Sequence, residues 1–134
     1  MAGIYIHIPF CRKKCHYCNF HFTTSLYYKD DLVKAIANEI SQQKDYLQNE
    51  RVETIYFGGG TPSLLNIEDV VLILDRVRRY FQITDNPEIT LETNPDDITE
   101  EKIIGWKEAG INRLSIGIQS FFEEDLQWMN RAHN

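Results

Sequence analysis

The chain has 134 residues, of which 43% are hydrophobic and 25% charged, so it is long enough to bury the core of one globular domain. Its formal net charge is −6 and its basic residues are scattered, apart from Arg12-Lys13-Lys14, which excludes the broad basic face typical of nucleic-acid-binding proteins and leaves that triplet as a solvated loop or a local anion contact. Because no apolar run approaches the roughly 20 residues of a membrane span and no secretory signal opens the chain, we expect a cytoplasmic protein without a membrane span.

The first half of the chain predicts two strands, each followed by a helix. Residues 3–8 alternate between apolar and polar types and predict a strand, which a proline ends. Apolar residues then recur on one helical face over residues 28–47. A second strand is expected over residues 52–57, and Asn66 is the candidate N-cap of a helix that continues to Phe81.

The second half repeats this order. An Asn-Pro break precedes a third strand over residues 88–92, and Thr99 is the candidate N-cap of a helix through Ala109, with a glycine suited to its C-terminal end. Residues 113–119 predict a fourth strand, and a further helix begins near Glu123 without a stop signal, so we expect the front part of a longer protein. The repeated order predicts an α/β fold with an open, curved sheet of parallel strands, because four such units cannot close an eight-stranded barrel.

Four notable segments follow the ends of the predicted strands. They are the cysteine-containing loop and residues 58–60, 92–95 and 119–120. In parallel α/β sheets, ligands bind at the edge where the strands end. We therefore expect a binding site at that edge.

All three cysteines of the chain, Cys11, Cys15 and Cys18, lie within eight residues. Since a disulfide framework is not expected in a cytoplasmic chain, this clustering predicts a metal site. The C-x3-C-x2-C spacing suits three corners of an iron–sulfur cluster with one iron left open, because such clusters usually take four thiolates. A zinc site of three cysteines and one histidine remains the alternative, with His7, His16 and His21 as candidate fourth ligands.

Other residues at the predicted edge have two interpretations each. The glycines of residues 58–60 let another molecule approach the backbone or form a tight turn, and they match neither a P-loop nor a G-x-G-x-x-G motif. Glu92 either accepts hydrogen bonds from sugar hydroxyls or is an exposed charge at a strand end. Gln119 and Arg131 also have two interpretations. Each can contact a ligand, but Gln119 can instead face solvent and Arg131 can instead pair with a surface acid.

Together these motifs resemble the radical S-adenosylmethionine (SAM) superfamily. Its most specific mark is C-x3-C-x2-C with an aromatic residue, here Tyr17, before the last cysteine, and GGGTP after the second strand is the next. The segments YIHIPFC, YFGGGTPS, LETNPDD, RLSIGIQSF and NRAHN are similar to one group within it, the oxygen-independent coproporphyrinogen III oxidases and the related haem chaperones. The resemblance covers essentially the whole chain.

The resemblance implies a fold, cofactors and roles for individual residues. The implied fold is α/β, with residues 1–134 forming the first four βα units of a partial (βα)6 TIM-like radical SAM barrel, as the N-terminal part of its core domain. Three thiolates would bind a [4Fe-4S] cluster, and SAM would chelate its fourth iron. The implied metal ligands are Cys11, Cys15 and Cys18, and the implied SAM contacts are Tyr5, Tyr17, Gly59, Gly60, Thr61, Glu92, Gln119 and Arg131.

Two features of the chain favour the haem chaperones over the oxidases of this group. The oxidases carry a further cysteine two residues after the last ligand, where this chain has Phe20, and they have a longer extension before the position of Tyr5. A chaperone would bind haem and transfer it to haem-receiving proteins, whereas the alternative is an enzyme that converts coproporphyrinogen III to protoporphyrinogen IX. Both interpretations imply an electron donor such as flavodoxin or ferredoxin. The candidate haem ligands, by residue type, are His7, His16, His21 and His133.

Overall fold

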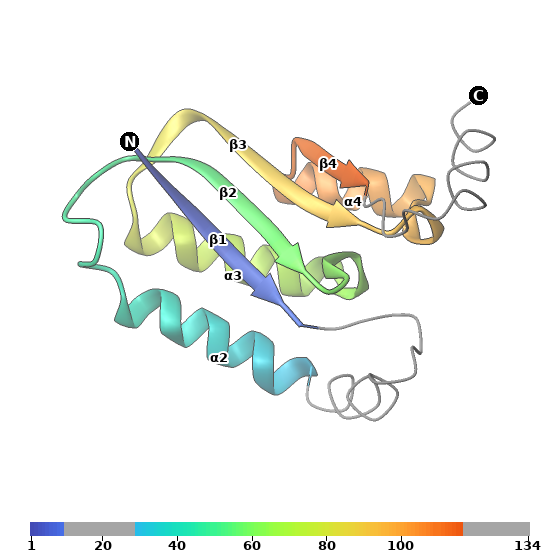
Figure 1. The fold of residues 1–134 in the computed structure, drawn as a ribbon, viewed down its shortest axis with the longest axis horizontal. Helices are drawn as coiled ribbons and strands as arrows, with labels where there is room; N and C mark the ends of the chain where they lie inside the picture. Colours follow the sequence, from blue (N-terminus) through green and yellow to red (C-terminus); the bar gives the residue numbers. More distant parts are fainter. Residues whose placement is uncertain (10–28, 117–134) are drawn as a thin grey trace, which may run out of the picture.

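The computed structural model describes residues 1–9 and 29–116, which form a parallel sheet and the helices that cover it (Figure 1). The strands are β1 (Ala2–Ile8), β2 (Val52–Gly59), β3 (Ile83–Thr93) and β4 (Arg113–Ile116). The helices are α2 (Lys29–Gln42), α3 (Ile67–Tyr80) and α4 (Glu100–Ala109), and short 3-10 turns, η1 (Pro62–Leu64) and η2 (Pro95–Asp97), follow β2 and β3. The strand order is β1-β2-β3-β4 and each pair is parallel, which confirms the predicted α/β fold with an open parallel sheet.

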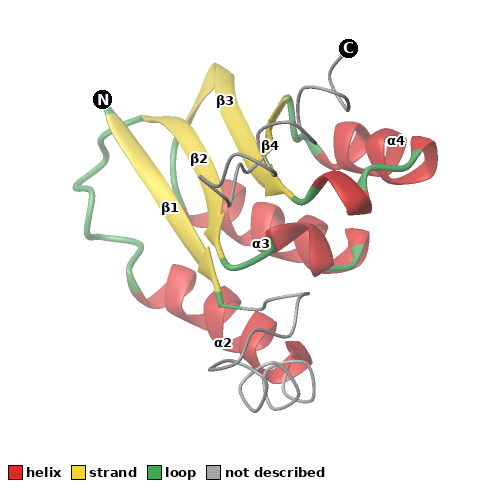
Figure 2. Cartoon of the chain, turned by 45° about the vertical axis from the view of Figure 1, so that its right-hand side comes forward, coloured by secondary structure: helices red, strands yellow, loops and turns green. Residues whose placement is uncertain are grey.

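One face of the sheet is buried against the helices. The strand residues on this face are almost fully buried: Ile6, Ile8, Ile55, Phe57, Ile89 and Leu91. The helices contribute buried side chains to the same core, among them Val33, Val70, Ile73, Leu74, Val77 and Trp106. Figure 2 shows α2, α3 and α4 on the same side of the sheet, so the alternate strand residues point to a face that no described helix covers.

The predicted helix boundaries are largely confirmed. Thr99 caps α4, since its Oγ1 accepts a hydrogen bond from the Lys102 N–H at 3.1 Å, and the Asn66 N–H donates to Asp69 Oδ2 at 3.1 Å at the start of α3. The first predicted helix, expected over residues 28–47, ends earlier, at Gln42, and is followed by a turn. None of the helices in the described ranges is long and apolar enough to cross a lipid bilayer.

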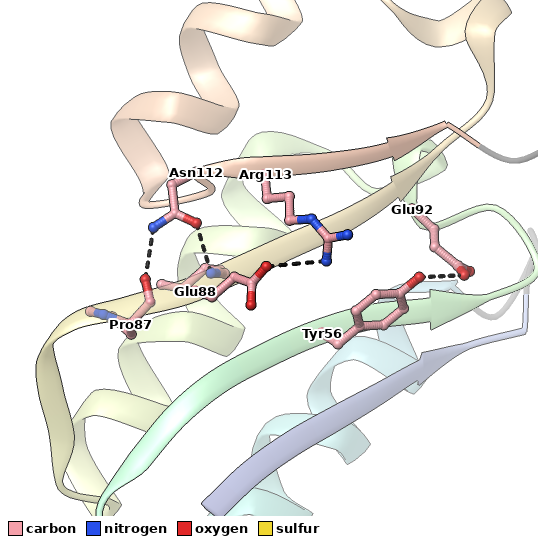
Figure 3. Close-up of polar contacts among 7 residues, drawn as sticks. Tyr56, Pro87, Glu88, Glu92, Asn112 and Arg113 are labelled. Atoms are coloured by element: carbon pink, nitrogen blue, oxygen red, sulfur yellow. Dashed lines mark hydrogen bonds and ion pairs between the residues drawn. The ribbon is translucent and has the colours of Figure 1, made fainter.

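The predicted break at Asn86-Pro87 is wrong, because β3 runs through it. Val52 pairs with Ile83 and Thr54 with Glu88, so residues 84–87 form an irregularity opposite one residue of β2. A proline has no N–H to donate, and an irregularity in a strand is where it is tolerated. The side chain of Asn112 stabilises the segment: its Nδ2 donates to the Pro87 carbonyl at 2.7 Å, and its Oδ1 accepts from the Ile89 N–H at 2.8 Å (Figure 3).

A buried hydrogen bond joins the loops that follow β2 and β3. Ser63 in η1 donates its Oγ–H to Asp97 Oδ2 in η2 at 2.7 Å, and the exposed fractions of the two residues are 0% and 2%. The same Ser63 Oγ accepts from the Asn94 N–H at 3.2 Å, and Lys102 Nζ donates to the Ser63 carbonyl at 3.4 Å. The two loops that form the carboxyl edge of the sheet are therefore held to each other through polar groups in the interior.

Replacing Ser63 with alanine is expected to lower the free energy of unfolding by about 1–3 kcal/mol, because it removes a donor from a buried carboxylate and an acceptor from the Asn94 N–H. Urea denaturation measures the change. The matched control is Ser41→Ala near the C-terminal end of α2, where a partly exposed hydroxyl donates to the Asn38 carbonyl at 2.7 Å. That control should change stability by less than about 0.5 kcal/mol, and equal effects of the two substitutions would contradict the role assigned to Ser63.

Candidate functional site

The glycine-rich turn after β2 lies at the carboxyl edge of the sheet beside the end of β1. The Gly60 N–H donates to the Ile8 carbonyl at 2.8 Å, which ties the turn to the last residue of β1. Gly59 has a φ of +113°, and a Cβ there would lie 2.8 Å from the His7 ring and from the Ile8 carbonyl oxygen. The turn therefore requires glycine at residue 59, because the backbone angle and the close approach to β1 both exclude a side chain.

Glu92 reaches this glycine turn from the neighbouring strand. Its Oε2 accepts a hydrogen bond from the Tyr56 hydroxyl at 2.7 Å (Figure 3). Its Oε1 accepts a hydrogen bond from the Gly59 N–H at 3.1 Å. The carboxylate is half-buried at the end of β3. Two of the predicted site residues, Gly59 and Glu92, are thus joined directly although they lie 33 residues apart in the sequence.

Tyr5 lies on the open face of the sheet with 58% of its surface exposed. Its ring stacks on that of Tyr56, with the ring centroids 6.0 Å apart and the planes 19° from parallel. Its hydroxyl lies 3.1 Å from His7 Nδ1. An exposed aromatic ring that is stacked on a second ring from the neighbouring strand is suited to stacking on a flat group of a ligand.

The electrostatics of the site depend chiefly on the Glu92 carboxylate. Its hydrogen bond to Tyr56 raises the pKa of that phenol above its usual value, and partial burial acts in the same direction. The Ser115 side chain and the charge of Arg113 act in the opposite direction and lower the pKa of the phenol. Because the net shift is upward, the Tyr56 hydroxyl keeps its proton at neutral pH and remains a donor.

Arg113 is engaged elsewhere on the open face. Its Nη1 lies 3.1 Å from Glu88 Oε1, and the two side chains are 57% and 49% exposed (Figure 3). Such a solvent-screened pair contributes little to stability. The Arg113 charge also lowers the pKa of the nearby Tyr56 phenol.

The structure brings together five of the predicted site residues: Tyr5, Gly59, Gly60, Thr61 and Glu92. The Thr61 side chain is buried, with 6% of the residue exposed, whereas the other four lie at or near the open edge. The remaining predicted residues lie outside the described ranges: Cys11, Cys15, Cys18, Tyr17, Gln119 and Arg131. Within residues 1–9 and 29–116, no three His, Cys, Asp or Glu side chains gather as a metal site.

Sequence reasoning missed Tyr56, which contacts both Tyr5 and Glu92. The sequence signal was strand alternation: Tyr56 is two residues before Gly58 and therefore lies on the same face of β2. The pairing of Tyr5 with Tyr56 depends on the register of the sheet, which the sequence does not show. The register likewise places Ser115 of β4 beside Glu92.

The residues described suit a ligand with a flat group and hydrogen-bond donors. The Glu92 carboxylate has further acceptor capacity on each oxygen, the glycine turn permits close approach, and Tyr5 presents a ring. SAM has this chemistry, with an adenine ring, ribose hydroxyls and an ammonium group. The donor set for a cluster would be the three thiolates, which match three irons of a four-iron cluster.

Comparisons with known proteins place this arrangement in a family. The model of the radical SAM superfamily matches residues 5–134. The chain is 41% identical over 133 residues to the heme chaperone HemW of Escherichia coli (strain K12), covering 98% of this chain and 35% of that protein. It is 37% identical over 135 residues to HemW of Bacillus subtilis (strain 168), covering 99% and 36%, and 35% identical over 134 residues to the mitochondrial radical S-adenosyl methionine domain-containing protein 1 of Mus musculus, covering 99% and 30%.

A solved structure shows the same fold. Coproporphyrinogen III oxidase (HemN) from Escherichia coli, a radical SAM enzyme, aligns with a TM-score of 0.71 and 31% sequence identity, covering 96% of this chain and 30% of that chain. The four parallel strands thus correspond to a fragment of its TIM-like barrel, as predicted, and the chain spans about a third of the length of the curated relatives it matches. The sheet, the glycine turn joined to Glu92 and the match over residues 5–134 show that the chain belongs to the radical SAM superfamily.

Proposed function

We propose that the chain is the SAM- and cluster-binding part of a haem chaperone, which binds haem and passes it to target proteins. The observation that carries this proposal is the 35–41% identity, over nearly the whole chain, to proteins named heme chaperone HemW. Phe20, which stands where the oxidases have a further cysteine, supports the same choice. The proposal includes a cytoplasmic location, residues 1–134 as the N-terminal part of the core domain, and flavodoxin or ferredoxin as the type of electron donor.

Membership of the superfamily implies a [4Fe-4S] cluster and SAM. We assign the cluster to Cys11, Cys15 and Cys18, because they are the only cysteines of the chain and have the family's spacing. When bound, the two cofactors supply one-electron cleavage of a C–S bond of SAM, which yields a hydrogen-abstracting radical. The protein contributes placement and exclusion of water around that chemistry.

The residues at the carboxyl edge would hold SAM. Glu92 accepts hydrogen bonds from the hydroxyl or ammonium donors of SAM, while the Gly59-Gly60 turn lets it approach the backbone and Tyr5 stacks on its flat part. Thr61 contributes to the shape of the turn from its buried position. We assign Tyr17, Gln119 and Arg131 to SAM as well, on the strength of their positions in the family motifs.

Haem would bind through a histidine, for which the sequence offers His7, His16, His21 and His133. His7 lies on the open face of β1, next to the stacked tyrosine rings, with its Nδ1 at 3.1 Å from the Tyr5 hydroxyl. A hydrogen bond on one ring nitrogen fixes the orientation of the other, as is common for metal-binding histidines.

The second candidate is an oxygen-independent coproporphyrinogen III oxidase, which produces protoporphyrinogen IX. The observation that favours it is the structural match to HemN at 31% identity. It differs from the first candidate in predicting a chemical change in the tetrapyrrole.

Replacing Cys11 with alanine is expected to abolish the iron–sulfur cluster, because two thiolates cannot hold it. Iron and sulfide content after anaerobic reconstitution, with the visible absorption of the cluster, measures the loss. His7→Ala, His16→Ala and His21→Ala are the controls, and all three should retain iron. Unchanged iron in Cys11→Ala would refute the ligand assignment, whereas a protein that retains zinc and loses it in any of the three histidine variants would establish the zinc alternative.

The two candidate functions are separated by incubating the full-length reconstituted protein anaerobically with SAM, a reductant and either haem or coproporphyrinogen III. We expect haem to remain bound through gel filtration and coproporphyrinogen III to be recovered unchanged, with slow release of 5′-deoxyadenosine. Liquid chromatography of the porphyrins and absorption spectra of the protein are the measurements. Stoichiometric decarboxylation of coproporphyrinogen III would overturn the chaperone proposal.

A further inference from the structure

Tyr56 occupies the centre of the open face, between the exposed ring of Tyr5 and the carboxylate of Glu92. In the parallel register it pairs with Tyr5 on one side and with Thr90 on the other. A Cβ added at Gly58 would lie 2.8 Å from the Tyr5 ring and 2.9 Å from the Tyr56 ring. Both rings therefore lean over Gly58 toward the glycine turn, which brings the Tyr56 hydroxyl within 2.7 Å of Glu92.

The Glu92 carboxylate is held by two donors from β2. The Tyr56 hydroxyl bonds one oxygen and the Gly59 N–H bonds the other, and no lysine or arginine within residues 1–9 and 29–116 forms an ion pair with Glu92. A carboxylate has about four acceptor sites, so about two are left for a ligand. A glutamate side chain has several rotatable bonds, and without both donors these remaining sites would point in many directions.

The Tyr56 hydroxyl has a second polar neighbour. Ser115 of β4 pairs with Glu92 in the register of the sheet, and its side chain lowers the pKa of the Tyr56 phenol. Since the pKa of Tyr56 is raised by its bond to Glu92, the phenol remains a donor to the carboxylate at neutral pH. Hydrogen bonds that involve an ionised acceptor are the stronger kind, so this contact is able to fix the carboxylate.

We propose that Tyr56 is a positioning residue for SAM, whose hydroxyl holds the Glu92 carboxylate against the Gly59 N–H so that its free acceptor sites face the donors of the cofactor. The inference rests on the proposed function of Glu92. Tyr56 acts through Glu92 and does not contact the reacting atoms. Its absence should therefore weaken SAM binding more than it slows the cleavage of bound SAM.

The test compares four forms of the full-length protein after anaerobic cluster reconstitution: wild type, Tyr56→Phe, Glu92→Gln and the double variant. We expect Tyr56→Phe to raise the Kd for SAM, measured by calorimetry, on the order of tenfold, the effect of losing a charge-assisted hydrogen bond. Glu92→Gln should raise it at least as much, and the double variant should bind no more weakly than Glu92→Gln alone. The KM for SAM should follow the Kd, with kcat for SAM cleavage within about twofold of wild type.

Tyr46→Phe is the matched control, because it removes the same hydroxyl from a residue that is 77% exposed and that, among the described residues, forms no hydrogen bond with Glu92. It should bind SAM as wild type does. Iron content and melting temperature must be equal in Tyr56→Phe and wild type, which the retained ring stacking makes the expected result. A Tyr56→Phe variant that unfolds would instead be replaced by Ser115→Ala, which removes the polar side chain beside the Tyr56 hydroxyl and should raise the Kd by a smaller factor.

The outcomes separate this inference from the function on which it rests. The positioning role would be overturned if Tyr56→Phe bound SAM as tightly as wild type, or if the affinity losses of the two single variants added fully in the double variant. If Glu92→Gln still bound SAM more weakly than wild type, the proposed SAM site would remain supported. Wild-type affinity in Glu92→Gln, or no SAM binding by the wild type, would overturn the role of Glu92 and with it that of Tyr56.

Discussion

Parallel pairing of the four strands is the constraint on which the rest of the structure depends. Each connection has to return across the sheet, and because the strands lie in chain order and such crossovers are right-handed, the helices lie on one face. There α2, α3 and α4 bury the alternate residues of the strands. It also places the carboxyl ends of the strands along one edge. The glycine turn after β2 and the carboxylate at the end of β3 meet there because the register of the sheet leaves them no other position.

Polar contacts stabilise the carboxyl edge of the sheet both on its open face and in the interior. On the open face, Glu92 accepts from Tyr56 and from the Gly59 N–H, while in the interior Ser63 donates to Asp97 between the two following turns. The interior contact holds the loops at a defined spacing, and the outer contact orients the group that meets solvent. A loop carrying a catalytic or binding group needs such support, because loops without it are mobile.

The sequence was sufficient for features that depend on local patterns. Strand alternation, helical stripes and the capping residue Thr99 predicted the α/β order and the loops that meet at the carboxyl edge of the sheet. It was insufficient where residues distant in the chain cooperate. The irregular strand around Pro87 depends on Asn112, and the role of Tyr56 depends on a cross-strand register that no local pattern shows. All cluster and SAM assignments remain predictions. Those of the cysteines, Tyr17, Gln119 and Arg131 concern residues outside the described ranges.

The strands lie side by side in the order in which the chain is synthesised. Each new strand needs only its predecessor as a template, so the segment closed at each step is a single βα unit, and the entropic cost of closure stays small. Such a sheet can grow from its first strand while the ribosome is still adding later ones. In that order, the donors of β2, the Tyr56 hydroxyl and the Gly59 N–H, are present before Glu92 is translated.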